Sequence, residues 1–139
     1  MKKALSIIAM TAASFGFMAH SYASPAELKA NYEAAKDQAK ADYEKAKDAC
    51  DAMKDNAKDV CEKEAKAARV KTEAEAKATY KGTPAAHKDA MMDIADANYE
   101  VAKEKCDDLK GNAKDACQKE AKAEKAKAEA DAKMAGAKK

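Results

Sequence analysis

Small and apolar side chains recur along the first half of the chain at spacings of three and four residues. The series keeps a period of about 11 residues, or roughly three turns of an α-helix. Its members are Tyr32, Ala35, Ala39, Tyr43, Ala46, Cys50, Ala57, Cys61, Ala65 and Ala68. Such a stripe suits close contact between helices, but alanine buries little area per residue. The pattern predicts an all-α fold of long, Ala/Lys-rich amphipathic helices.

Helix start and stop signals divide this pattern into shorter pieces. Ser24 can cap a helix, Pro25 suits its first position, and Glu27 completes a capping box. In residues 82–84, Gly82 ends a helix, Thr83 caps the next one, and Pro84 opens it.

Two weaker turn signals lie inside the halves, at residues 55–56 and 111–112. There we expect Asn56 and Asn112 to cap the helices that follow. These breaks predict four helices of roughly 25 residues each, a common helix length.

Opposite charges recur four residues apart, as in an isolated helix stabilised by surface ion pairs. The expected pairs are Lys29 with Glu33, Asp59 with Lys63, Glu62 with Lys66, Glu73 with Lys77, Asp115 with Lys119, and Glu129 with Lys133. Together with the high alanine content, they favour helix over a disordered chain.

The chain also contains an internal duplication. Residues 42–44 match 98–100, and residues 50–61 match 106–117, with one constant offset between the two copies. A match of this length exceeds what shared composition produces, so it indicates two copies of one module. We therefore predict helical repeats at 24–81 and 82–139.

Residues 1–23 have the pattern of a secretory signal peptide. Lys2 and Lys3 precede an apolar run over 4–17, and Ser21-Tyr22-Ala23 fits a cleavage site. The run is about 14 residues, shorter than the roughly 20 that span a bilayer. We expect cleavage near Ala23, a periplasmic location and no membrane span, with weak membrane-surface contact allowed. Export to an oxidising compartment predicts two disulfides from the four cysteines.

The spacing of the cysteines leaves two pairings open. Cys50 and Cys61 would lie about 16.5 Å apart on an unbroken helix, and a disulfide needs Cα atoms within about 7 Å. Two long helices folded at Gly82 would join Cys50 to Cys117 and Cys61 to Cys106. Two separate hairpins would join Cys50 to Cys61 and Cys106 to Cys117. The second pairing is slightly preferred, because it explains a glycine at position 111 inside a helical run.

Composition narrows the function classes. Of the 27 basic side chains, Lys2 and Lys3 lie in the signal segment, and the other 25 equal the 25 acidic ones, so the rest of the chain has no electrostatic reason to bind nucleic acid. The large aliphatic residues of this part are Leu28, Val60, Val70, Ile94, Val101 and Leu109. So few cannot line a thick core or an ordinary active site, and we therefore expect no enzyme and no cofactor.

Soft-metal chemistry is the remaining candidate for a site. The four cysteines could bind copper together with Met53, Met91, Met92 and His87. Disulfides are the preferred interpretation in an exported protein, and we therefore expect no metal site.

The signal peptide, the paired Tyr-Glu-x-Ala-Lys units at 43–47 and 99–103, and the twin Asn-Ala-Lys-Asp-x-Cys segments carry a resemblance. The chain resembles small exported bacterial proteins, Ala/Lys-rich and labelled TolA-like or cell-envelope proteins. This resemblance implies a role in the envelope and no site residues. The period of the stripe is also similar to that of late-embryogenesis-abundant desiccation proteins.

These features predict a non-enzymatic structural or interaction protein of the cell envelope, built as a stapled helical rod or small bundle. Its partners would be an envelope protein or further copies of itself. Tyr32, Tyr43 and Tyr99 lie on or near the stripe and are candidate anchors for a partner. A stress or desiccation protectant is the first alternative, and a thiol or copper buffer is the second.

Overall fold

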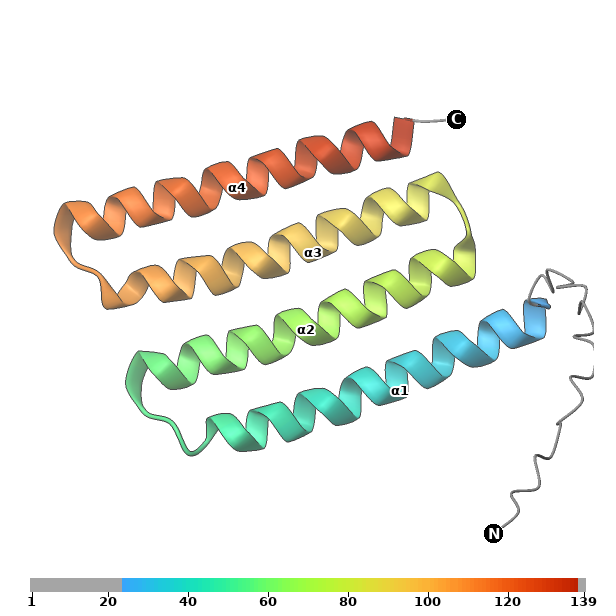
Figure 1. Cartoon of the computed structure of the whole chain (residues 1–139), viewed down its shortest axis with the longest axis horizontal. Helices are drawn as coiled ribbons and strands as arrows, with labels where there is room; N and C mark the ends of the chain where they lie inside the picture. The colour runs from blue at the N-terminus through green and yellow to red at the C-terminus, as the bar shows by residue number, and fades with distance from the viewer. Residues whose placement is uncertain (1–23, 138–139) are drawn as a thin grey trace, which may run out of the picture.

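A computed structural model describes residues 24–137 as four α-helices joined by short turns (Figure 1). They are α1 (Pro25–Cys50), α2 (Asp55–Lys81), α3 (Pro84–Lys105) and α4 (Gly111–Ala137), and a 3-10 turn, η1 (Cys106–Asp108), precedes α4. No strand occurs among these residues, which confirms the all-α fold. The expected signal peptide, residues 1–23, lies outside the described residues.

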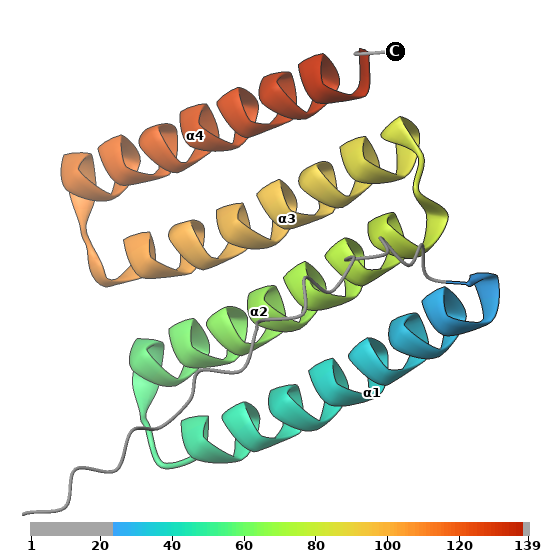
Figure 2. The ribbon, with the colours of Figure 1, turned by 45° about the vertical axis from the view of Figure 1, so that its right-hand side comes forward.

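The four helices lie side by side in a single layer. Each helix packs against the next one in sequence, and α1 and α4 occupy opposite edges (Figures 1 and 2). Consecutive helices run antiparallel, so α1–α2 and α3–α4 are helical hairpins. The layer is neither a rod nor a closed bundle. Each helix has only narrow alanine stripes toward its neighbours, and the described helices have no wide apolar face that closing the layer would bury.

The strongest helix signals of the sequence act as expected. Ser24 Oγ accepts a hydrogen bond from Glu27 N at 3.2 Å, and Glu27 Oε2 accepts one from Ser24 N at 2.6 Å. Between α2 and α3, Gly82 has a φ of 60°, a left-handed conformation that glycine adopts without strain. Thr83 Oγ1 then accepts from Ala86 N at 3.1 Å. These contacts confirm the capping box and the turn between the two hairpins.

The turns inside the hairpins differ from the expectation. Asn56 and Asn112 lie within α2 and α4 rather than capping them, and α2 has Lys54 as its N-cap without a side-chain hydrogen bond. Asn56 Nδ2 instead donates to the carbonyl oxygen of Glu104 on α3, at 3.2 Å. The helix begins one residue early because Asp55, with a φ of 52°, makes the turn through its backbone.

Asp55 and Gly111 occupy equivalent positions in the two modules and share this left-handed conformation, with φ values of 52° and 53°. Asp55 carries a Cβ that strains this conformation, whereas Gly111 does not. We predict that Asp55→Gly raises the free energy of unfolding by about 0.5–1 kcal/mol, and that Gly111→Asp lowers it by a similar amount. Urea denaturation of both variants checks this. Equal and opposite shifts are expected, and a loss of stability in Asp55→Gly would contradict the strain.

Alanine forms almost the whole core. The buried apolar residues are Ala39, Cys50, Ala65, Ala74, Ala78, Ala86, Ala90, Ala95, Cys106, Ala121 and Ala132. No polar or charged side chain is buried among the described residues. Of the predicted stripe, Ala57 and Ala68 are exposed and the other members are buried or half-buried. The helix break after α1 interrupts the period. This explains why both exposed members of the stripe, Ala57 and Ala68, follow the break.

Each disulfide links the two arms of one hairpin near its turn. Cys50 bonds Cys61 with a Cα–Cα distance of 5.6 Å, and Cys106 bonds Cys117 at 5.7 Å. The non-helical turns between α1 and α2 and between η1 and α4 bring these cysteines together. The structure therefore has disulfide bonds, as expected, in the pairing that the sequence slightly preferred.

The charges pair differently from the sequence expectation. Within residues 24–137, none of the six expected pairs comes within 4.0 Å. Glu73 pairs with Arg69 on its own helix, and Lys63 reaches across to Glu100 on α3. With charges this dense, each lysine has several carboxylates in reach, and the packing of neighbouring helices selects among them.

Candidate interaction surface

Two of the three candidate tyrosines make the same contact in both hairpins. The guanidinium of Arg69 lies 5.5 Å from the ring centre of Tyr43, and Lys125 Nζ lies 5.2 Å from that of Tyr99. Tyr99 and Lys125 are the counterparts of Tyr43 and Arg69 in the second module. Each cation also pairs with a carboxylate one turn later, Glu73 or Glu129. The duplication thus preserves a cation–π pair that joins the two helices of each hairpin.

Tyr32 belongs to a contact that only the first hairpin has. Its ring stacks on that of Tyr80, with ring centres 5.3 Å apart and an angle of 7° between the ring planes. Lys36 Nζ lies 5.2 Å from the centre of the Tyr32 ring. In the second hairpin the counterparts are Lys88 and Gly136, and a Cβ on Gly136 would lie 3.0 Å from Lys88 Cβ. The hairpins therefore share their disulfide ends and differ at their open ends.

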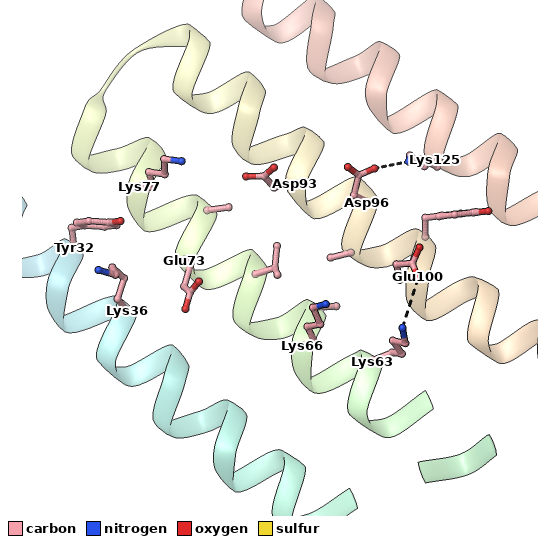
Figure 3. A pocket seen from close by; sticks show the side chains of 15 residues that line it. Tyr32, Lys36, Lys63, Lys66, Glu73, Lys77, Asp93, Asp96, Glu100 and Lys125 are labelled. Atoms are coloured by element: carbon pink, nitrogen blue, oxygen red, sulfur yellow. Dashed lines mark ion pairs between the residues drawn. The ribbon is translucent and has the colours of Figure 1, made fainter. Parts of the chain in front are cut away.

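A groove of about 740 Å³ runs over one face of the layer (Figure 3). All four helices contribute to it: Tyr32 comes from α1, Val70 from α2, Tyr99 from α3 and Lys125 from α4. Val70 and small alanines give the groove apolar surface, and its two tyrosines come from α1 and α3, the helices on either side of α2. Tyr43 lines a smaller neighbouring hollow of about 290 Å³, which shares Lys63 and Lys66 with the groove. All three tyrosines therefore line one or the other of two hollows that share lining residues.

Charged side chains of both signs surround the groove (Figure 3). They are Lys36, Lys63, Lys66, Lys77, Lys125, Glu73, Asp93, Asp96 and Glu100. Two ion pairs cross between helices here: Lys125 Nζ lies 2.6 Å from Asp96, and Lys63 Nζ lies 3.7 Å from Glu100. The hydrogen bond to Asp96, with its charge, raises the pKa of Lys125 above its ordinary value. Lys66, Lys77 and Asp93 have no ion pair within residues 24–137 and are open to a partner.

Each disulfide-linked turn carries the same ion pair. Lys58 Nζ lies 2.8 Å from Asp51, and its counterpart Lys114 lies 2.8 Å from Asp107. The hydrogen bond from the lysine, with its charge, lowers the pKa of Asp51 and of Asp107 below the ordinary value. A lowered folded-state pKa adds stability above the ordinary carboxyl pKa, and this stability is lost as the pH falls through the lowered value.

We therefore predict that the melting temperature falls as the medium is acidified from about pH 5 to about pH 2. Replacing both aspartates, by Asp51→Asn and Asp107→Asn together, should make this decline shallower. Thermal melts of the two proteins at several pH values provide the measurement. Identical slopes would show that the two turn pairs do not contribute to the acid sensitivity.

Sequence reasoning missed the partners of the tyrosines, namely Tyr80, Arg69 and Lys125. A usable signal was present for two of them. The interval from Tyr43 to Arg69 equals the interval from Tyr99 to Lys125. A basic residue held at the same distance from tyrosine in both modules indicates a contact between the helices of a hairpin. No such signal exists for Tyr80, because its counterpart is Gly136.

The residues considered for copper do not gather at one place. Met53 lies in the turn after α1, whereas His87, Met91 and Met92 lie on α3. The four cysteines are all in disulfides, so the structure has no free thiol. Within residues 24–137, no three His, Cys, Asp or Glu side chains come close enough together to hold a metal ion.

Among the described helices, none is both long enough and apolar enough to cross a membrane. The expected roles of Tyr32, Tyr43 and Tyr99 as partner anchors stay predictions, as do the TolA-like and desiccation-protein resemblances. Comparison with known proteins leaves these predictions unchanged: no family model, no curated protein and no solved structure matches the chain.

Proposed function

We propose that this chain is a non-enzymatic structural or interaction protein of the cell envelope, exported to the periplasm after cleavage near Ala23. It acts by presenting the grooved face of the helical layer to a partner polypeptide. The observation that carries the proposal is the groove itself. It joins apolar alanine and valine surface, two half-buried tyrosines and charges of both signs over all four helices.

The composition of this groove suits a partner helix. Tyrosine gives large contact area at low cost in conformational entropy, and the surrounding charges orient a partner without fixing a single small ligand. Lys66 and Lys77 lie on α2 with no intramolecular ion pair in the described part of the chain, so they are free to contact carboxylates. An amphipathic helix with acidic flanks is the partner that this arrangement fits best.

Chemical crosslinking in intact cells, followed by mass spectrometry of the products, tests the proposal. We expect the wild-type protein to be crosslinked to an envelope protein through lysines of the groove. Lys77→Glu should reduce that product several-fold, because it places a negative charge where an acidic partner lies. Lys71→Glu is the matched control: it makes the same charge change on the same helix, where Lys71 lies outside the groove and pairs with Glu75.

Recovery of the protein without any crosslinked partner would contradict the proposal, and so would equal loss of crosslinking in both variants. The two alternative functions predict other results. A desiccation protectant would be largely disordered in solution and gain helix on drying, whereas a folded layer melts cooperatively. A thiol or copper buffer would need reduced cysteines, and copper binding would disappear when the cysteines become serine.

A further inference from the structure

The contact between the two hairpins shows how one module of this chain packs on the next. Ala74 and Ala78 of α2 form a buried cluster with Ala90 of α3, and Ile94 packs against it. Farther along the same interface, Lys63 Nζ lies 3.7 Å from Glu100 and 4.0 Å from Glu104. The interface therefore combines an alanine contact at one end with one lysine between two carboxylates at the other.

The duplication places counterparts of these residues on the two outer edges of the layer. At the offset that matches residues 50–61 to 106–117, α2 corresponds to α4 and α3 corresponds to α1. Ala130 on α4 is the counterpart of Ala74, and Ala34 on α1 is the counterpart of Ala90. The inner alanines are 6% and 7% exposed, whereas both outer ones are exposed to solvent. The same small side chains are thus covered inside the layer and uncovered at its edges.

The Lys63 cluster of the interface is also kept at the edges, with opposite signs on opposite helices. The other ion pair of this interface, Lys105 with Glu64 at 2.6 Å, is not kept, because Lys105 has Ala49 as its counterpart. Lys119 on α4 corresponds to Lys63, while Glu44 and Asp48 on α1 correspond to Glu100 and Glu104. Within residues 24–137, these three outer side chains have no ion pair within 4.0 Å. One edge therefore carries the free lysine, and the other edge carries the two free carboxylates that would complete the same cluster.

Two size changes at the edges offset one another. Ile94 has Gln38 as its counterpart on α1, which removes a large apolar side chain from that edge. Ala78 has Met134 as its counterpart on α4, which adds one on the other edge, and Met134 is 61% exposed. Methionine adapts to irregular gaps, so it suits the space opposite Ala34.

We propose that the protein self-associates head to tail, with α4 of one copy packed on α1 of the next copy as α2 packs on α3 within the chain. Lys119 then lies between Glu44 and Asp48 of the second copy, and Met134 covers the alanine contact. This inference rests on the proposed function of an interaction protein and names one partner, a second copy of the chain. Since the two joined edges are different, each added copy leaves one free edge of each kind, and association continues to chains or rings rather than stopping at a two-fold dimer.

The association is expected to be weaker than the internal contact. Within one chain, the short turn at Gly82 holds α2 and α3 at an effective concentration in the millimolar range. Two separate copies lack this link and need a high protein concentration, such as accumulation in a confined compartment provides.

Sedimentation of the purified, oxidised protein over a wide concentration range tests the proposal. We expect the average mass to rise with concentration and to pass the mass of two copies. Lys119→Glu should raise the dissociation constant at least about tenfold, because three carboxylates then meet at the contact. Adding Glu44→Lys and Asp48→Lys to the same chain should restore association, since the charges are then exchanged. Lys122→Glu is the control: it makes the same charge change on α4, at the counterpart of the groove residue Lys66.

A protein that stays monomeric up to about 1 mM would overturn the proposal, since the internal contact forms at that effective concentration. A closed dimer that does not grow would also overturn it, and so would equal effects of Lys119→Glu and Lys122→Glu. The test uses the purified chain alone, so its failure leaves the crosslinking of an envelope partner in cells as a separate question. Conversely, self-association without any envelope partner would support this inference and contradict the proposed role of the groove in binding an envelope protein.

Discussion

Removing both disulfides should cost this protein more stability than any single substitution. Each bond joins cysteines with a sequence separation of 11, and closing a loop of that length contributes about 3 kcal/mol in the chain-entropy model. The alanine core provides little burial to offset this loss, because it lacks fully buried large aliphatic side chains in the described residues. We expect Cys50→Ser with Cys61→Ser to lower the melting temperature sharply, and replacement of all four cysteines to leave little cooperative structure at physiological temperature.

The second hairpin supplies a matched comparison for the first. Cys106→Ser with Cys117→Ser removes an equivalent bond and should cost a similar free energy, since both pairs have the same sequence separation. Circular dichroism melts of the oxidised protein, the two double variants and the quadruple variant provide the measurement. An unchanged melting temperature in the quadruple variant would contradict the role given to the disulfides.

Placing a charge between α2 and α3 should cause the second-largest loss. Ala90 is 7% exposed and packs in the cluster with Ala74 and Ala78, so Ala90→Glu brings a carboxylate into a contact built for a methyl group. We expect a loss of about 3 kcal/mol in the free energy of unfolding, from overpacking and from burial of an unpaired charge. Urea denaturation at dilute protein concentration checks this value.

The duplication again offers a matched control, Ala34→Glu. Ala34 is the counterpart of Ala90 but lies exposed at the outer edge of α1. Both substitutions replace alanine by glutamate inside a helix, so the difference in helix propensity between the two residue types cancels in the comparison. Ala34→Glu should change the free energy of unfolding by no more than about 0.5 kcal/mol. Equal losses at both positions would show that Ala90 is not at a packed interface.

Local signals explain which parts of the fold the sequence predicts. The helices, the capping box at Ser24 and the turn at Gly82 depend on residues close together in the chain, and all of them agree with the structure. The disulfide pairing required one further step. A glycine at position 111 indicated a turn inside the module, and that turn brings Cys106 and Cys117 together.

The arrangement of the helices could not be predicted in this way. A narrow alanine stripe indicates contact between helices, but it does not determine whether the fourth helix packs against the first. The groove depends on that arrangement, because Tyr32 and Lys125 come from opposite edges of the layer and meet the same hollow. The ion pairs were missed for a related reason. Lys63 has carboxylates on its own helix, and only the position of α3 makes Glu100 its partner.

The groove and the free edges both depend on the open, single-layer arrangement of the four helices. Neighbouring helix axes lie roughly 8–10 Å apart, so the axes of α1 and α4 should be separated by roughly 24–30 Å. A closed bundle would place these two helices in direct contact. The two arrangements therefore differ most in the contacts between α1 and α4.

Zero-length carbodiimide crosslinking, which joins lysines to carboxylates in contact, measures this difference directly. It should be done on dilute protein mixed from isotopically light and heavy chains, so that links within one chain are distinguished from links between copies. We predict links of Lys105 to Glu64 and of Lys125 to Asp96, whose atoms lie 2.6 Å apart in both cases, and no link within one chain between α1 and α4. Links between α1 and α4 of the same chain would contradict the open layer.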